Sequence, residues 1–208
     1  MVGEGVLHEC LLSVEVEHIL VINRKPCGVT HPKLKEIIHK DFYDLSPIQD
    51  QLVNYNACFY CLGITSLRMS EEDYTKITYT LTTYIAEILA KQNPDMTFCY
   101  VSGAGTDGTG KRKNMWMRVK GATENKLLSM PFRQAYMFRP GFMRPTKGLK
   151  NTLKLYKVIN WMFPLLRFLF PKFFCTLKEV GVAMINTVHK GYDKQLLEVK
   201  DIVPLAKK

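Results

Sequence analysis

The sequence predicts an α/β fold, a doubly wound parallel sheet that lacks its first strand and carries a small C-terminal helical lid. Short apolar runs of strand length alternate with longer helical stretches, which is typical of parallel sheets with helical crossovers. The chain opens on a helical pattern that contains glycines. The apolar strand and glycine-rich turn that normally lead into such a helix are not complete in the sequence. Its 208 residues suffice for one domain with a sizeable core, so a single domain over residues 1–208 is expected.

Six runs rich in apolar, β-branched or aromatic residues are expected to form the strands. They cover approximately residues 18–23, 34–39, 57–62, 96–101, 134–138 and 196–199. Ligands of open parallel sheets bind outside the carboxyl ends of the strands. The residues just after these runs are therefore the first candidates for a site, and they include Arg24, Asp41, Gly63, Ser102 and Gly141.

Helices are expected between these strands. Ser70 and Asp73 resemble a capping box with a shorter acid, and they predict one long helix from Ser70 to about residue 90. Asn93 and the proline after it should end that helix. Further helices are expected near the N-terminus, at residues 115–128 and at residues 176–189, the last with Gly191 as its C-terminal stop.

The lid is expected over residues 145–190, inserted before the last strand. Its stretch 155–174, LYKVINWMFPLLRFLFPKFF, has the length of a membrane-spanning helix. Basic residues interrupt the stretch, however, and Pro164 should break or kink a helix there. A pair of amphipathic helices that covers a pocket is favoured, and contact of this segment with a membrane surface is the alternative.

The net charge of +10 favours anionic partners such as a phosphorylated cofactor or an acidic membrane. The sequence shows no groove-reading helix and no basic tract with interleaved aromatics, so nucleic acid is not expected as a partner. Cys58 and Cys61 have the spacing of a redox or zinc pair but should point to opposite faces of a strand, which favours core thiols. The first residues lack a signal-peptide pattern, and a cytoplasmic location is expected.

Two stretches carry a resemblance to a known family. The opening MVGEGVLHECLL resembles the second half of a glycine-rich phosphate loop, with Gly3 as its last glycine. In YVSGAGTDGTGKRKNMWMRVKGATENKLL, Ser102 ends a strand, and Trp116 stands four residues before Lys120 on the next helix. This order resembles the serine and the Tyr-x-x-x-Lys motif of atypical short-chain dehydrogenases/reductases, in their NAD-dependent epimerase/dehydratase branch. The resemblance covers nearly the whole chain, to about Asp201, and implies a Rossmann-like NAD(P)-binding domain.

In this family the first strand lies centrally in the sheet, and here it and the first glycines of the loop are missing. The sequence is therefore expected to be truncated, for instance by a misplaced start codon. An upstream reading frame without a strand and a glycine turn would contradict that expectation.

The resemblance also implies a cofactor site. Arg24 follows the family's second strand, where a basic residue suits the 2′-phosphate of NADP, so NADP is expected, with NAD as the alternative. Asp41 falls where the family places an acid near the adenine. The Arg-Pro-Gly run shapes the substrate side in the epimerase/dehydratase branch. The expected cofactor-binding residues are Gly3, Arg24, Asp41, Leu62, Gly63, Lys120, Arg139, Pro140 and Gly141.

The expected catalytic residues are Ser102, Trp116 and Lys120, with tryptophan in the place of the family's tyrosine. A phenol beside a lysine can exchange a proton with a substrate oxygen. An indole keeps an N–H donor but releases no proton at a useful pH, so the usual general acid/base is lost. Asp107, Tyr100 or a bound water could replace it, and the sequence does not decide among them.

The sequence thus favours an NAD(P)-dependent oxidoreductase or epimerase acting on a carbonyl or hydroxyl group of a small molecule. Aromatic residues in the lid favour an apolar or bulky substrate. Two alternatives stay open. One is a non-catalytic, nucleotide-binding redox sensor or partner-binding protein, and the other is a peripheral membrane protein that uses the lid.

Overall fold

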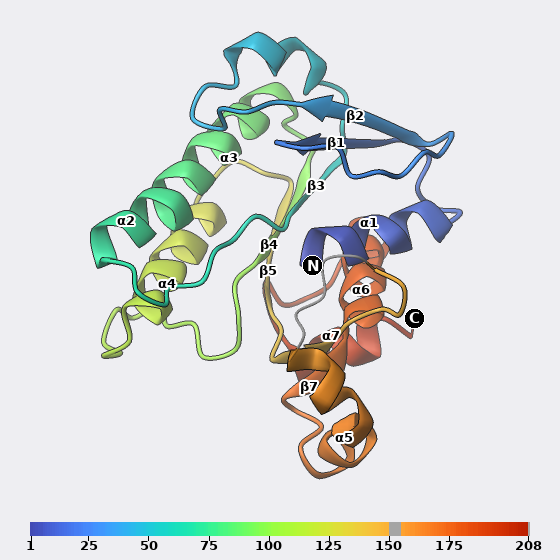
Figure 1. Ribbon diagram of the computed structural model, residues 1–208. Helices are drawn as coiled ribbons and strands as arrows, with labels where there is room; N and C mark the ends of the chain where they lie inside the picture. The colour runs from blue at the N-terminus through green and yellow to red at the C-terminus, as the bar shows by residue number, and fades with distance from the viewer. Residues whose placement is uncertain (150–154, 208) are drawn as a thin grey trace. The chain divides into compact units, whose positions relative to one another are not determined.

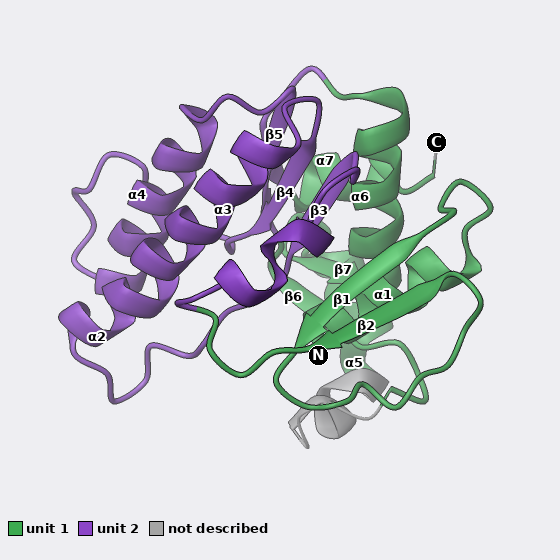
Figure 2. Cartoon of the chain, turned by 90° about the horizontal axis from the view of Figure 1, so that it is seen from above, with its two compact units in different colours: residues 1–42, 140–192, 198–208 green, residues 43–139, 193–197 purple. Residues whose placement is uncertain are grey.

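The computed structural model describes residues 1–149 and 155–207, and it divides into two compact units, shown in Figure 2. Unit 1 comprises Met1–Phe42, Pro140–Tyr192 and Glu198–Lys208, and unit 2 comprises Tyr43–Arg139 and Asp193–Leu197. Each unit is therefore built from chain segments that are distant in the sequence. The prediction of a single domain stays a prediction, because a division by contacts does not make each unit an independent domain.

Unit 2 is built on a sheet with the strand order β3-β4-β5-β8. Its strands are β3 (Ala57–Tyr60), β4 (Thr97–Val101), β5 (Gln134–Arg139) and β8 (Leu196–Glu198), and β3, β4 and β5 are parallel. The side chains of Phe98, Tyr136 and Phe138 are fully buried on this sheet. The near-continuous burial of β4 and β5 is what parallel strands covered on both faces require.

The helices of unit 2 are α2 (Glu71–Thr75), α3 (Leu81–Gln92) and α4 (Met115–Leu128), with a π-helical turn, η2 (Lys76–Thr80), and a short 3-10 helix, η1 (Ser46–Gln51). Figure 1 shows α3 and α4 side by side. The predicted cap is confirmed, because Ser70 Oγ accepts from the backbone N–H of Asp73 at 3.0 Å. The predicted single helix after Ser70 is interrupted by the π turn, which propensity alone does not reveal.

Unit 1 contains a parallel pair, β1 (Ile19–Asn23) and β2 (Leu34–Ile38), and a second parallel pair, β6 (Phe142–Arg144) and β7 (Phe174–Thr176). Its helices are α1 (Val2–Leu12), α5 (Leu155–Leu169), α6 (Leu177–Lys190) and α7 (Val199–Leu205). A capping box at Thr176 begins α6, and Gly191, at a φ of 69°, ends it as predicted.

The predicted fold class is confirmed, because each unit contains parallel strands with helices. Dinucleotide-binding sheets have the strand order 3-2-1-4-5-6. In that order β2 and β1 are the third and second strands, and β3, β4 and β5 are the fourth to sixth. Among the described residues no strand takes the first position, so β1 and β3 each keep one edge that no strand covers.

The lid differs from the prediction. Where two amphipathic helices were expected before α6, the described part contains one helix, α5, followed by strand β7. Pro164 lies inside α5 and does not end it. Residues 150–154 of the predicted lid lie outside the described residues. Within the described ranges, no helix has the length and the apolar composition to cross a membrane.

Helix α1 packs closely against α6 in unit 1, and this approach depends on glycine (Figure 1). A Cβ on Gly5 would lie 2.2 Å from Cδ2 of the fully buried Leu177. The resemblance makes Gly3 the last glycine of a phosphate loop, but Gly3 is exposed in the structure. Gly5, two residues later, therefore makes the close approach.

We predict that Gly5→Ala lowers the free energy of unfolding by about 1–2 kcal/mol, because overpacking outweighs the gain in helix propensity. Denaturant unfolding measures the change. Gly3→Ala is the matched control on the same helix, and it should be neutral or stabilising by less than about 1 kcal/mol. Equal effects of the two substitutions would contradict the assignment of the packing to Gly5.

Candidate functional site

A buried carboxylate, Glu124, organises the carboxyl ends of two strands in unit 2. Ser102, directly after β4, donates its hydroxyl hydrogen to Glu124 Oε1 at 2.5 Å. The guanidinium of Arg139, at the end of β5, forms a bidentate pair with the same carboxylate. The Glu124 side chain is only 1% exposed. The Glu124 side chain therefore connects helix α4 to the ends of both strands.

Lys120 lies one turn before Glu124 on the same face of α4. Its ammonium donates to the backbone carbonyl of Ser102 at 2.5 Å. Burial lowers the pKa of Lys120 to about 8, although the nearby Glu124 carboxylate opposes this shift. Near neutral pH the group is therefore still mostly an ammonium, but it loses its proton more readily than an ordinary lysine does.

Trp116, in the first turn of α4, borders the loop that follows Ser102. A Cβ on Gly103 would lie 3.8 Å from the Trp116 ring, and one on Gly105 would lie 3.9 Å from it. Both glycines have positive φ angles, 155° and 88°, which favour glycine. The structure thus places Trp116 beside the loop and Lys120 on the carbonyl of Ser102, in one region of unit 2.

The two candidate side-chain replacements for the missing phenol are poor proton donors. Hydrogen bonds from the Thr109 hydroxyl and from the backbone amides of Arg112 and Thr109 lower the pKa of Asp107 to about 2. Its carboxylate is therefore ionised at neutral pH and has no proton to give. Tyr100 is fully buried, and burial raises the pKa of its phenol.

The other predicted site residues of unit 2 are Leu62, Gly63 and Arg139. Gly63 is exposed after β3, with open space where a Cβ would be, and Leu62 is half-buried. The Arg139 guanidinium is engaged by Glu124, so its observed partner is a protein carboxylate. Its role toward a cofactor stays a prediction.

The remaining predicted residues belong to unit 1. Arg24 and Asp41 are exposed after β1 and β2, as their strand-end positions predict. Pro140 is buried. A Cβ on Gly141 would lie 2.3 Å from the carbonyl oxygen of Phe173, so packing within the unit already requires glycine there. The cofactor contacts of these residues are untested.

Glu124 is the residue that the sequence analysis missed. It stands on α4 near Val119, Thr123 and Leu127, which are all buried. A charged residue on a buried helix face normally has a partner. Its position on the buried face of the predicted helix, four residues after Lys120, was the sequence signal that could have identified Glu124.

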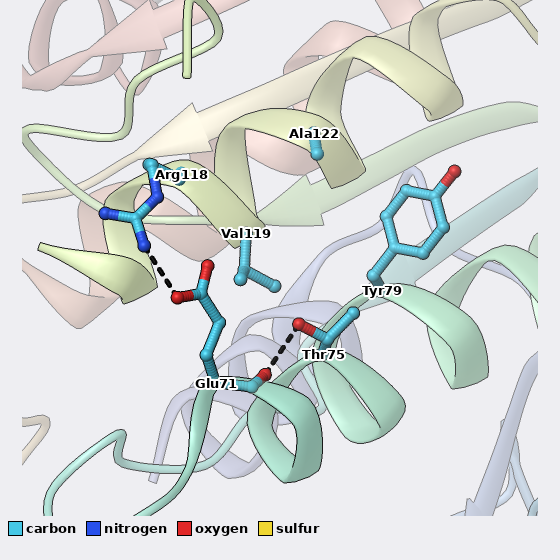
Figure 3. Close-up of a pocket in the computed structure, with 6 residues that line it drawn as sticks. All are labelled: Glu71, Thr75, Tyr79, Arg118, Val119 and Ala122. Carbon is cyan, nitrogen blue, oxygen red and sulfur yellow. Dashed lines mark hydrogen bonds and ion pairs between the residues drawn. The ribbon is translucent and has the colours of Figure 1, made fainter. Parts of the chain in front are cut away.

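A groove of about 280 Å³ lies on another face of α4, and Figure 3 shows its lining. Arg118 forms an ion pair with Glu71 at 2.6 Å across its polar end. Arg118 and Lys120 are two residues apart, so they project to nearly opposite sides of the helix. The groove therefore lies apart from the Ser102 cluster. It is lined by Glu71, Thr75, Tyr79, Arg118, Val119 and Ala122.

No family model matches the chain. A curated relative is the mitochondrial protein FMP52-1 of the yeast Scheffersomyces stipitis, 25% identical over 221 residues that span all of this chain and 95% of that protein. The expectation of a cytoplasmic location was wrong by this comparison, because the relative is a mitochondrial protein.

Solved structures share the fold. An ADP-L-glycero-D-manno-heptose-6-epimerase of Helicobacter pylori has a TM-score of 0.64 at 14% identity, over all of this chain and 78% of that one. A dTDP-glucose 4,6-dehydratase of Streptomyces venezuelae, solved with NAD, has a TM-score of 0.64 at 9% identity, over 99% and 76%. The chain therefore has the Rossmann-like fold of epimerase/dehydratase enzymes, as the sequence resemblance predicted.

We predict that Arg139→Met destabilises the protein by about 3 kcal/mol, because it leaves the Glu124 carboxylate buried without its cation. Denaturant unfolding at neutral pH measures the loss. The exposed pair of Lys126 and Glu87, 3.4 Å apart, supplies the control. Lys126→Met should change stability by less than about 1 kcal/mol. A similar loss in both variants would argue against a special role for the buried pair.

Lys120 should make stability depend on pH. Its folded pKa of about 8 lies below the ordinary lysine value of 10.5, so between these values the unfolded state binds more protons. The free energy of unfolding should then rise with pH across this window. From pH 8 to 10.5, the free energy of unfolding of the native protein should rise relative to that of Lys120→Met, as measured by denaturant unfolding of both proteins at each pH. Parallel curves for the two proteins would show that the pKa of Lys120 is not lowered.

Proposed function

We propose that the protein binds a nicotinamide dinucleotide and acts as an oxidoreductase or epimerase on a carbonyl or hydroxyl group of a small molecule. The observation that carries this proposal is the cluster at the carboxyl end of β4, where Lys120 binds the backbone of Ser102 and Trp116 borders the next loop. Ligands of such sheets bind at this end of the strands. Structures with the same fold include enzymes solved with NAD.

Residues of each unit, taken separately, have chemistry that suits such a cofactor. The exposed Arg24 offers a planar guanidinium to a phosphate, which favours NADP over NAD. Gly63 leaves open space where a side chain would otherwise stand. Lys120 adds a donor near Ser102 for a ribose hydroxyl. When bound, the dinucleotide supplies the two-electron redox chemistry.

The chain's own side chains then orient the substrate. The Trp116 indole can donate a hydrogen bond to a substrate oxygen or stack on a ring. The Ser102 hydroxyl gives its hydrogen to Glu124, so it would have to rotate before it could donate to a substrate. Of the three replacements that the sequence leaves open, Asp107 is ionised and Tyr100 is buried, which leaves a bound water.

A second candidate is a nucleotide-binding redox sensor without turnover. Trp116 favours it specifically, because an indole cannot act as the proton-transferring group. Cofactor binding does not distinguish the two candidates, since both hold the same cofactor. Only turnover separates them.

The decisive experiment combines cofactor binding with turnover. We predict that NADPH fluorescence reports binding, that Arg24→Ala weakens it about tenfold, and that Lys91→Ala, an exposed control, leaves it unchanged. We also predict that Trp116→Tyr, which restores a phenol one turn before Lys120, raises turnover on a carbonyl panel by about 100-fold.

The outcomes separate the candidates. If neither NADPH nor NADH binds the folded protein at millimolar concentration, the proposed function is wrong. Binding without turnover, in both the native protein and Trp116→Tyr, would support the sensor. Turnover by the native protein that Lys120→Met abolishes would support the enzyme.

A further inference from the structure

Unit 1 presents an apolar surface on α5 and the turn that follows it. Leu165, Phe168 and Leu169 are 59%, 83% and 55% exposed, and they share one face of the helix at i, i+3 and i+4 spacing. Phe170 and Phe173, just beyond the helix, are also more than half exposed. We call these five residues the α5 surface. Large apolar side chains gathered in nine residues form a patch, which soluble surfaces seldom leave without a partner.

The helix that carries this surface is fixed to its own unit by its opposite side. Phe163 is buried and lies against Phe142 and Phe174 of the small β6–β7 sheet. Arg144 and Arg167 lie over its ring at 5.1 and 5.9 Å. These contacts account for the inward position of Phe163. Among the residues that the structure describes, the outward apolar side chains have no such explanation in the packing of unit 1.

Arg167 adds a second attachment. Its guanidinium pairs with Glu179, which also completes the capping box of α6. The start of α6 and the end of α5 are thus joined by one carboxylate. The α5 surface is therefore presented in a fixed orientation relative to unit 1.

The sequence around the α5 surface is strongly basic, and its nearest acid along the chain, Glu179, is already paired with Arg167. Between residues 140 and 178 the sequence contains eight lysines and arginines and no aspartate or glutamate. Lys172, between Phe170 and Phe173, and Lys178, five residues after Phe173 along the chain, are exposed. Phenylalanine and leucine among lysines suit the boundary of an anionic bilayer, where apolar side chains enter the lipid and cations meet the headgroups.

We propose that the α5 surface docks on anionic lipid bilayers and holds the protein at a membrane surface without crossing it. The same charge pattern argues against a second copy as the occupant, because two like surfaces would bring their cations together. The proposal is independent of the proposed enzymatic function. It assigns a role outside the cofactor site to part of the segment that was predicted to form a lid.

Flotation of the full-length protein with vesicles tests this proposal. We expect binding to vesicles of phosphatidylglycerol and phosphatidylcholine, and much weaker binding to phosphatidylcholine alone. The double variant Phe168→Ser, Leu169→Ser should lower the partition coefficient by at least roughly tenfold, because both side chains are lost from the lipid boundary. Lys172→Glu with Lys178→Glu should also lower it, and 0.5 M salt should do the same.

Matched controls use residues of comparable exposure elsewhere in the chain. Leu12→Ser and Leu67→Ser remove side chains that are 68% and 74% exposed, and they should leave binding unchanged. Lys40→Glu with Lys91→Glu is the charge control. Circular dichroism confirms that every variant is folded, which is expected because all the substituted side chains are exposed.

Three results would overturn the proposal. The first is a folded protein that does not float with anionic vesicles at low salt. The second is binding that the Phe168→Ser, Leu169→Ser variant retains in full, or binding to neutral vesicles of equal strength. The third is a dimer, measured by light scattering, that the same variant dissociates while vesicle binding is absent, since the occupant would then be a second copy.

Discussion

The buried carboxylate of Glu124 is the interaction on which the arrangement of unit 2 depends. A charge that is 1% exposed is tolerated only with partners, and Ser102 and Arg139 supply them from the ends of two neighbouring strands. The two strands are adjacent in the sheet, so one helix residue sets the distance from α4 to both. Lys120, one turn earlier, then reaches the backbone of Ser102. The geometry of the candidate site therefore depends on the contacts of Glu124 with Ser102 and Arg139.

Much of the local structure could be predicted because its signals are local. The bounds of α4 agree with the expected residues 115–128, and Ser70 and Gly191 act as a cap and a stop. The pairing of β6 with β7 could not be predicted, since each strand is three residues long and the pairing joins distant segments. Glu124 was missed for a similar reason, because its partner Arg139 follows fifteen residues later on a different element.

The strand order within each unit follows the alternation of apolar runs and helices along the chain. Taken separately, β2 beside β1 in unit 1 and β3-β4-β5 in unit 2 keep neighbour relations of a dinucleotide-binding sheet. Each remaining pair is stabilised by its own ladder and by the helices of its own unit. Residues such as Arg24 and Ser102 therefore reach strand ends in separate units, as their sequence positions predict.

The loop after Ser102 is held on α4 at two points. A Cβ on Gly121 would lie 1.9 Å from the carbonyl oxygen of Asp107, and the Asn125 amide donates to the carbonyl of Gly108 at 2.8 Å. The first half of the loop is therefore ordered together with the helix. A ligand that contacts Trp116 meets a surface that has already lost its conformational freedom, so association there carries a small entropic cost. Selectivity between ligands would then arise from shape, since this part of the protein has little capacity to adapt.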